Sequence, residues 1–362
     1  MSTQHQTTQH NSAQCANRRS PRPSPTPSPK KPIAVSGDRP TGALHLGHYA
    51  GSLATRLQLQ ETHEQYLLIA DLQALTDNAE APRQIAANVV EVALDYLAIG
   101  LDPARSTFCV QSHTPELAEL TMYLLNLVSI GRLQRNPTVK SEIGQRRSKG
   151  GIPAGFLMYP VNQAADITAF RASVAAVGED QLPVIEQTNE IVRSVNRICD
   201  HAVLPEVTAR VGRAARLPGP DGGSKMSKSL GNVLRLSATG DDIQRFVNRM
   251  YTDPTHLRAE DPGKTEGNVV FTYLDAFAPD TLDVEALRQH YRRGGLGDVT
   301  LKQQLVAILD ALLAPIRIRR AHFANDRGEV LRLLRVGTDR ARGPAALTLS
   351  VLRRALGFNY FA

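Results

Sequence analysis

Residues 33–48 read IAVSGDRPTGALHLGH and join a short apolar run to a glycine-rich turn. The run at 33–36 predicts a buried β-strand, and a helix is expected to begin near Gly47. The first turn of a helix presents free N–H groups and a partial positive charge, which suit a phosphate group. Gly37, Gly42 and Gly47 would let the backbone approach a ligand closely, because they carry no Cβ atom. The stretch therefore predicts a strand, a phosphate-binding turn and a helix.

Two histidines lie at the predicted start of this helix. His45 and His48 are three residues apart, so both side chains can face the same edge of a pocket. Imidazole groups can donate hydrogen bonds to the negative charge that grows on a phosphate under attack. Paired histidines can also be structural caps of a helix, and the motif alone leaves both interpretations open.

Strands and helices alternate on the C-terminal side of this stretch. Apolar residues recur at helical spacing from Ile85 to Tyr96, after a proline at position 82 that suits a first helical turn. Because strands alternate with helices, we predict an α/β fold with a Rossmann-type, doubly wound parallel sheet. The predicted strands are 33–36, 66–70, 107–110 and 174–177, and further helices are predicted at 117–127 and 182–198.

A second basic segment, KMSKS at residues 225–229, lies near the C-terminal end of this α/β region. Lys225 and Lys228 are three positions apart with hydroxyl groups beside them, which makes a compact clamp for an anion. Three glycines between residues 219 and 223 give the flexibility of a closing loop, predicted over 222–230. Alone, the segment could be a solvated surface loop. Together with the histidine motif it predicts a nucleotide site.

The remaining chain divides by composition. Residues 1–31 are rich in Ser, Thr, Gln and Pro and hold five of the seven net positive charges without an acid, so we predict a disordered basic tail. A mobile basic loop is predicted over 132–151, facing either solvent or the phosphates of a ligand or tRNA. After residue 232 the strand signal fades, and 233–362 is predicted to be a helical domain. Its helices are predicted at 241–251, 284–291, 301–313, 329–334 and 347–356.

Composition also limits the class of protein. The chain is 42% hydrophobic and 21% charged, as soluble globular proteins are. It shows no secretory signal and no evident membrane-spanning run. Three widely spaced cysteines fit no metal site or disulfide framework, which favours a reducing, cytoplasmic location.

A candidate recognition pocket comes from residues 158–167, MYPVNQAADI. Tyr159, Gln163 and Asp166 are spaced i, i+4, i+7 and share one face of a helix. A carboxylate in an otherwise apolar pocket requires a donor from the ligand, such as an indole N–H or a phenol O–H. Leaving such a group unpaired is costly, so analogues without the donor would be excluded.

The two basic motifs together resemble those of the class I aminoacyl-tRNA synthetases. Residues 45–48 resemble their first signature, and 225–229 match their second signature letter for letter. Within that class, residues 36–48, the run 159–167 and the Gly-Glu-Asp-Gln at 178–181 are similar to the tryptophanyl-tRNA synthetase family. The resemblance covers about residues 32–362.

This resemblance implies a Rossmann catalytic domain over 32–232, an anticodon-binding helical domain over 233–362, and a homodimer. It also implies that tryptophan reacts with ATP to give tryptophanyl-adenylate and pyrophosphate, followed by transfer to the 3′ end of tRNA(Trp). Mg²⁺ would be bound through the ATP phosphates, with no metal site built from protein side chains and no membrane partner.

Individual roles follow from the same resemblance. His45 and His48 would serve the α-phosphate, while Lys225 and Lys228 would stabilise the β- and γ-phosphates. Asp166 would bind the indole nitrogen in a pocket shared with Gln163, and the amino group would be held by Tyr159 and Gln181. The residues implied to hold ATP are Arg39, Pro40, Thr41, Gly47, His48, Gly178, Glu179, Asp180, Leu217, Lys225, Met226, Ser227, Lys228 and Ser229.

Two alternatives stay open. Gln163 beside Tyr159 and Asp166 is similar to tyrosyl-tRNA synthetase, since many tryptophan enzymes have Met at the Gln163 position, whereas the Gly-Glu-Asp-Gln segment favours tryptophan. A non-catalytic paralogue with a regulatory or partner-binding role is the other alternative. The completeness of both signatures argues against it.

Overall fold

The computed structural model describes residues 31–146, 152–213 and 217–361. Residues Lys31–Ala362 form one compact unit. The tail predicted over 1–31 lies, except for Lys31, outside the described residues.

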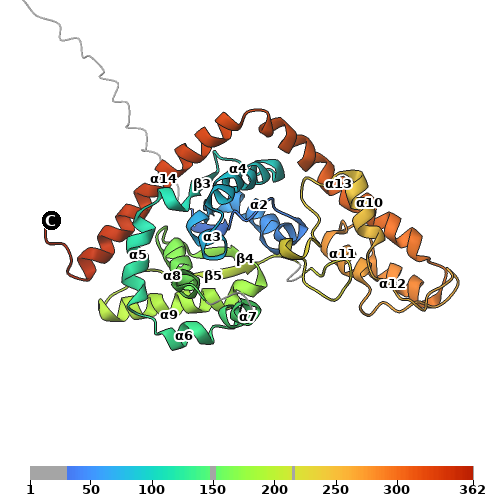
Figure 1. The fold of residues 1–362 in the computed structure, drawn as a ribbon, viewed down its shortest axis with the longest axis horizontal. Helices are drawn as coiled ribbons and strands as arrows, with labels where there is room; N and C mark the ends of the chain where they lie inside the picture. The colour runs from blue at the N-terminus through green and yellow to red at the C-terminus, as the bar shows by residue number, and fades with distance from the viewer. Residues whose placement is uncertain (1–30, 147–151, 214–216, 362) are drawn as a thin grey trace, which may run out of the picture. The chain divides into compact units, whose positions relative to one another are not determined.

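The described core is a five-stranded parallel sheet (Figure 1). Its strands are β1 (Ile33–Asp38), β2 (Glu64–Ile69), β3 (Ser106–Val110), β4 (Val174–Val177) and β5 (Thr208–Val211), in the order β3-β2-β1-β4-β5. The prediction of a doubly wound parallel sheet is confirmed. The sequence did not reveal β5, because this edge strand is largely exposed and has no continuous apolar run.

Helices cover both faces of the sheet. Alternate strand residues point to opposite sides, so Leu67 and Phe108 join the apolar cluster of α4, whereas Tyr66 and Leu68 join that of α5, α8 and α9. The helices are α1 (Leu46–His48), α2 (Ala54–Thr62), α3 (Asp71–Asn78), α4 (Pro82–Ile99), α5 (Glu116–Leu125), α6 (Ile130–Arg135), α7 (Pro137–Arg146), α8 (Ala154–Thr168), α9 (Leu182–Ile198), α10 (Gly240–Asn248), α11 (Val269–Phe277), α12 (Val284–Arg293), α13 (Asp298–Ala324) and α14 (Arg327–Ala355), with a π-helical turn η1 (Tyr49–Leu53) after α1.

The prediction of a loop over 132–151 is wrong for the described part of this segment, which forms α6 and α7. Ser129 caps α6 by accepting a hydrogen bond from the Arg132 backbone N–H, and a proline at position 137 begins α7. The Arg132 guanidinium makes two hydrogen bonds, of 2.8 and 2.9 Å, to the carboxylate of Glu190 on α9. The many basic residues of this segment are typical of a solvated loop, which is why the sequence predicted a loop despite the two helix-start signals. Residues 147–151 lie outside the described part of the chain.

The C-terminal region is helical, as predicted. By length and composition, α13 could cross a membrane. One side of the helix is nevertheless buried in the fold, at Leu301, Leu305, Leu309 and Leu313, where it packs on α4, α10 and α11. The two helices predicted at 329–334 and 347–356 are one continuous helix, α14, which accommodates Pro344 in its interior.

Helix α14 packs on the sheet edge at β3 rather than on the other C-terminal helices alone (Figure 1). The Thr338 hydroxyl accepts a 3.1 Å hydrogen bond from the backbone N–H of Val110. Gly337 lies so close to β3 that a Cβ atom there would stand 2.0 Å from the carbonyl oxygen of Phe108. The division into domains at residue 232 therefore stays a prediction.

This close approach predicts a stability effect. Gly337→Ala should lower the free energy of unfolding by about 1–3 kcal/mol, because α14 must move away from β3. Gly144→Ala is the matched control, since Gly144 is helical with open space around its Cα, and it should be neutral or stabilising by up to about 1 kcal/mol. Urea denaturation measures both. Equal stability of Gly337→Ala and the wild type would contradict the packing.

Candidate active site

The candidate site lies where the strand order reverses, between the neighbouring strands β1 and β4. In open parallel sheets, ligands bind at this point beyond the carboxyl ends of the strands. The segment carrying His45 and His48 follows β1, and the segment Gly178–Gln181 follows β4, with its last three residues in a 3₁₀ turn, η3 (Glu179–Gln181). Two sequence-predicted segments are thus brought to one edge.

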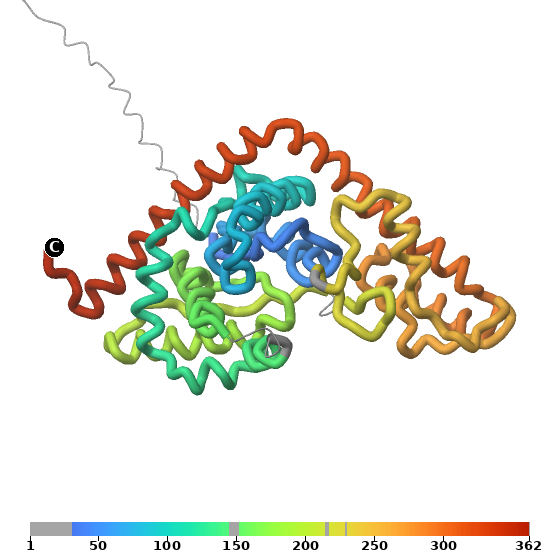
Figure 2. Tube along the Cα trace, in the orientation of Figure 1, coloured from blue at the N-terminus to red at the C-terminus, as the bar shows by residue number. Residues whose placement is uncertain are grey.

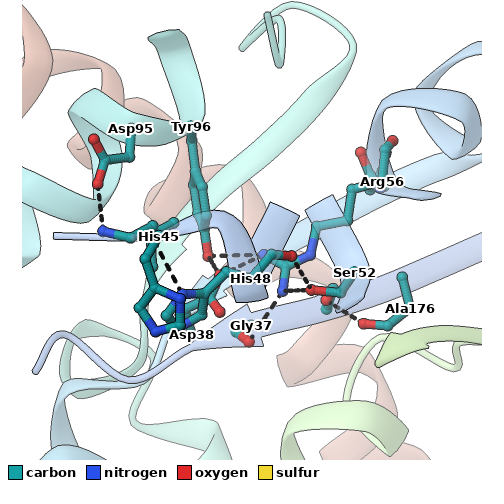
Figure 3. Close-up of polar contacts among 12 residues, drawn as sticks. Gly37, Asp38, His45, His48, Ser52, Arg56, Asp95, Tyr96 and Ala176 are labelled. Carbon is teal, nitrogen blue, oxygen red and sulfur yellow. Dashed lines mark hydrogen bonds and ion pairs between the residues drawn. The ribbon is translucent and has the colours of Figure 1, made fainter. Parts of the chain in front are cut away.

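His45 and His48 cap the start of α1 (Figure 3). The Nδ1 atom of His45 accepts from the Gly47 backbone N–H at 3.1 Å, and that of His48 accepts from the His45 backbone N–H at 3.2 Å. The two ring centres are 3.9 Å apart. A Cβ atom at Gly47 would meet the His45 ring at 2.9 Å, so a side chain there would displace the ring. The capping interpretation of the two histidines is therefore confirmed.

Each histidine uses only its Nδ1 atom for capping, so the rest of the ring remains available to a ligand. Burial lowers the pKa of His45 to about 2, helped by the charge of His48, and burial lowers the pKa of His48 to about 4 although Asp38 opposes this. Both rings are neutral at pH 7. A neutral imidazole whose Nδ1 accepts carries its proton on Nε2, so each ring keeps one donor for a ligand. The pair can hydrogen-bond a phosphate without adding charge.

The segment 225–229 lies against the first signature. Lys228 begins a 3₁₀ turn, η4 (Lys228–Leu230), and its Nζ donates a 2.7 Å hydrogen bond to the carbonyl oxygen of Gly42. Gly42 has φ +122°, a conformation that favours glycine. The backbone around Arg235 also pairs with that of His45, and Figure 2 shows the blue segment after β1 beside the yellow segment that follows residue 217.

A chain of polar contacts joins Lys225 to the predicted amino-acid pocket. The Nζ of Lys225 lies 3.2 Å from the Asp180 carboxylate, which accepts a 3.3 Å hydrogen bond from the Gln181 amide. The amide of Gln163 on α8 donates to Gln181 over 3.5 Å. The lysine segment, the end of β4 and α8 are therefore linked by a continuous series of polar contacts.

Asp166 is buried, with 5% of its surface exposed. Its carboxylate accepts hydrogen bonds from the Gln111 amide nitrogen at 2.9 and 2.8 Å. Burial raises the pKa of Asp166 to about 7, although Gln111 opposes the shift. Each carboxylate oxygen has a second lone pair, so Asp166 can still accept from a ligand N–H. Sequence reasoning missed Gln111, whose position directly after β3 was the available signal.

Tyr159 lies on α8, and its hydroxyl oxygen is buried without a hydrogen-bond partner. One carboxylate oxygen of Glu142 on α7 is also buried and unpartnered. Burial raises the pKa of both groups, and the Tyr159 hydroxyl lies close enough to the Glu142 carboxylate to act on it by charge and as a donor, although the geometry falls short of a regular hydrogen bond. Unpaired buried oxygens are costly, which makes this corner suited to a ligand's donor groups. The sequence interpretation did not include Glu142.

The other predicted ATP residues surround these contacts. Arg39 makes a 2.6 Å ion pair with Asp77 of α3. The Leu217 carbonyl accepts from the backbone N–H of Met226 at 3.1 Å, and both side chains are buried. Pro40 is buried, Gly178 is half-buried, and Thr41 and Glu179 are exposed. Ser227 donates its backbone N–H to Asn232, and Ser229 lies in η4.

Comparison with known proteins identifies the class. Residues 28–314 match the family described as "tRNA synthetases class I (W and Y)". The fold and the paired signatures agree with that match, so the chain belongs to the class I tRNA synthetases for tryptophan and tyrosine.

Curated relatives narrow the family further. The chain is 56% identical to the tryptophan–tRNA ligase of Clostridium longisporum over 335 residues, 91% of this chain and 98% of the relative. It is 54% identical to that of Streptococcus pneumoniae serotype 4 over 338 residues, with 91% and 99% covered. The chain belongs, within its class, to the tryptophan–tRNA ligases, which confirms the tryptophan prediction over tyrosine and over a non-catalytic paralogue.

Solved structures agree. Tryptophanyl-tRNA synthetase from Campylobacter jejuni, complexed with ADP and tryptophan, has a TM-score of 0.73 at 27% identity, covering 90% of this chain and 99% of that one. A tyrosyl-tRNA synthetase from Archaeoglobus fulgidus, with a TM-score of 0.62 at 22% identity over 81% of this chain and 91% of that one, shares the fold.

Proposed function

We propose that the chain activates L-tryptophan with ATP and transfers the product to tRNA(Trp). The observation that carries the proposal is the 2.7 Å hydrogen bond from Lys228 to Gly42, because it joins the two signature segments over one space. The chain of contacts from Lys225 to Gln163 connects that space to the pocket of α8. One adenylate could contact both.

In the proposed first step, the tryptophan carboxylate attacks the α-phosphate of ATP and pyrophosphate leaves. The Nε2 donors of His45 and His48 would stabilise the charge that develops on the α-phosphate. Lys225 and Lys228 would exchange their present partners, Asp180 and Gly42, for the leaving pyrophosphate. The enzyme needs no nucleophile of its own, so positioning and electrostatics supply the acceleration.

In the proposed recognition, Asp166 accepts the indole N–H, held in place by Gln111. The unpartnered Tyr159 hydroxyl and the Gln181 amide would bind the amino group. Among the described residues, no group of three His, Cys, Asp or Glu side chains could hold a metal ion. Mg²⁺ is therefore proposed to arrive with the ATP phosphates, whose charge it neutralises.

The proposal includes a cytoplasmic homodimer. Met122 on α5 and Ile130 at the start of α6 are 60% and 65% exposed, and a second copy that covered them would bury apolar area. Light scattering should give twice the mass of the chain. A monomer at micromolar concentration would remove the dimer from the proposal without affecting the active site.

The function itself is tested by pyrophosphate exchange with tryptophan and tyrosine side by side. We expect exchange with tryptophan and at most a trace with tyrosine at equal concentration, because the class-wide signatures are joined to a tryptophan-type pocket. Exchange that depends on tyrosine, or on neither amino acid, would overturn the proposal.

A further inference from the structure

A buried ion pair lies directly behind the histidine motif (Figure 3). Asp38, the last residue of β1, accepts hydrogen bonds from Arg56 at 2.5 Å and from the Tyr96 hydroxyl at 2.7 Å. Arg56 is 2% exposed, and it also donates to Ser52 at 3.0 Å and to the Gly37 carbonyl at 3.4 Å. Burying such a pair costs several kcal/mol in desolvation, often as much as the pair returns. Stability alone therefore does not explain why the Asp38–Arg56 ion pair lies beside the loop that carries the histidine motif.

The position of the Asp38–Arg56 ion pair suggests that it shapes the loop between β1 and the histidine motif. The loop from residue 38 to residue 44 is held at both ends by adjacent residues of α4: Tyr96 binds the Asp38 carboxylate, and Asp95 accepts from the Leu44 backbone N–H at 2.6 Å. The other oxygen of Asp95 accepts from Arg320 of α13 at 2.7 Å. Lys228 docks on the Gly42 carbonyl within this held loop. The carboxylate of Asp38 therefore fixes the surface that receives Lys228.

The charges around Lys228 also indicate a link between Asp38 and Lys228. Burial lowers the pKa of the Lys228 ammonium group to about 8; Asp38 is the strongest charge opposing this, and Asp95 is the next. Arg39 and Arg235 are the neighbouring positive charges, and they lower the pKa further. The two neighbouring histidines are neutral near pH 7, since burial holds their pKa values far below it. Arg56 in turn keeps Asp38 ionised, because its charge lowers the Asp38 pKa well below the usual value despite burial.

We propose that Asp38 is a positioning residue for amino-acid activation: clamped by Arg56 and Tyr96, it shapes the loop on which Lys228 docks and supplies the counter-charge of the Lys228 ammonium group. The inference rests on the proposed function of Lys228 as a phosphate-binding residue. The Asp38 carboxylate is taken up by Arg56 and Tyr96, so no direct contact with substrate is assigned to it. It acts through Lys228, so its removal should change the pH dependence of the reaction as well as its rate.

The test compares the wild type with Asp38→Asn, using kcat/KM for ATP in tryptophan-dependent exchange between about pH 6 and pH 10, because kcat/KM reports groups of the free enzyme. The charged form of Lys228 is present below its pKa and lost above it. The wild type should lose activity near pH 8. Without the Asp38 charge, that midpoint should fall by about one pH unit, so that at pH 8 the variant keeps roughly a tenth of its own low-pH activity, against about half for the wild type.

Asp298→Asn is the matched control. Asp298 accepts a 2.7 Å hydrogen bond from the Tyr291 hydroxyl, as Asp38 does from Tyr96, but it lies in the C-terminal helical region. The control should lose stability without moving the midpoint. If Asp38→Asn leaves Arg56 uncompensated and does not fold, Asp38→Asn/Arg56→Met removes both charges together and should show the same displacement. A folded variant lacking Asp38 with the wild-type midpoint would overturn the inference.

A second measurement needs no activity. The pH dependence of Lys228 acetylation by acetic anhydride, followed by mass spectrometry, reports the ionisation of this amine in the folded protein. Its midpoint should fall by about one unit in Asp38→Asn and stay in place in Asp298→Asn. An inactive wild type whose Lys228 still responds to Asp38 would overturn the proposed function alone. Unchanged labelling in an active Asp38→Asn variant would overturn the inference alone.

Discussion

Replacing Lys228 with alanine is expected to lower tryptophan-dependent pyrophosphate exchange by about 100- to 1,000-fold while leaving the fold intact. The lysine is half-buried, and its hydrogen bond to the Gly42 carbonyl can be exchanged for one to a phosphate oxygen. In a desolvated site, a positive charge stabilises a leaving pyrophosphate far more strongly than it would in water. Most of the loss should therefore appear in kcat.

The matched control is Lys302→Ala. Lys302 makes the same kind of contact, a 3.0 Å hydrogen bond from Nζ to the Asn248 carbonyl, away from the sheet edge. It should keep exchange within about twofold of the wild type. If Lys228→Ala exchanges at the wild-type rate while circular dichroism shows a native fold, the phosphate role of the second signature fails.

Much of the fold was predictable because apolar runs mark buried parallel strands. Strands β1 to β4 were found within two residues at each end, and α9 was predicted with its observed bounds. The edge strand β5 was missed since its residues face solvent and carry no such run. In α6 and α7, the basic composition was given more weight than Ser129 and Pro137, which signal the two helix starts.

The site was predictable only in part. A general rule of parallel sheets places residues that follow β1 and β4 at one edge, so the placement of the His45 segment and of Gly178–Gln181 at that edge could be expected. The partners of the predicted residues could not be, because they come from distant elements. Gln111 is 55 residues from Asp166, and Lys228 reaches Gly42 over 186 residues.

The second large effect is expected at Asp166. Asp166→Ala should lower kcat/KM for tryptophan by about 100-fold, since the indole N–H would lose a charged acceptor in a dry pocket. The same variant should leave kcat/KM unchanged for the tryptophan isostere in which sulfur replaces the indole N–H. The wild type prefers tryptophan because only the indole N–H can donate to the Asp166 carboxylate, and the variant has no acceptor at that position, so its preference should be lost.

The ratio of kcat/KM for tryptophan to kcat/KM for the isostere separates recognition from folding. A general defect of the enzyme lowers both values of kcat/KM by the same factor and leaves the ratio unchanged. Asp71→Asn is the matched control: Asp71 is a neighbouring charge of Asp166 that bonds to Ser112 instead, so its loss should preserve the ratio. Gln111→Ala should give an intermediate ratio, since Asp166 would stay in place but lose the amide that orients its carboxylate and holds its pKa down. An Asp166→Ala enzyme that still prefers tryptophan by the wild-type factor would mean that the indole nitrogen is recognised elsewhere, and the proposed orientation of tryptophan against α8 would have to be reversed.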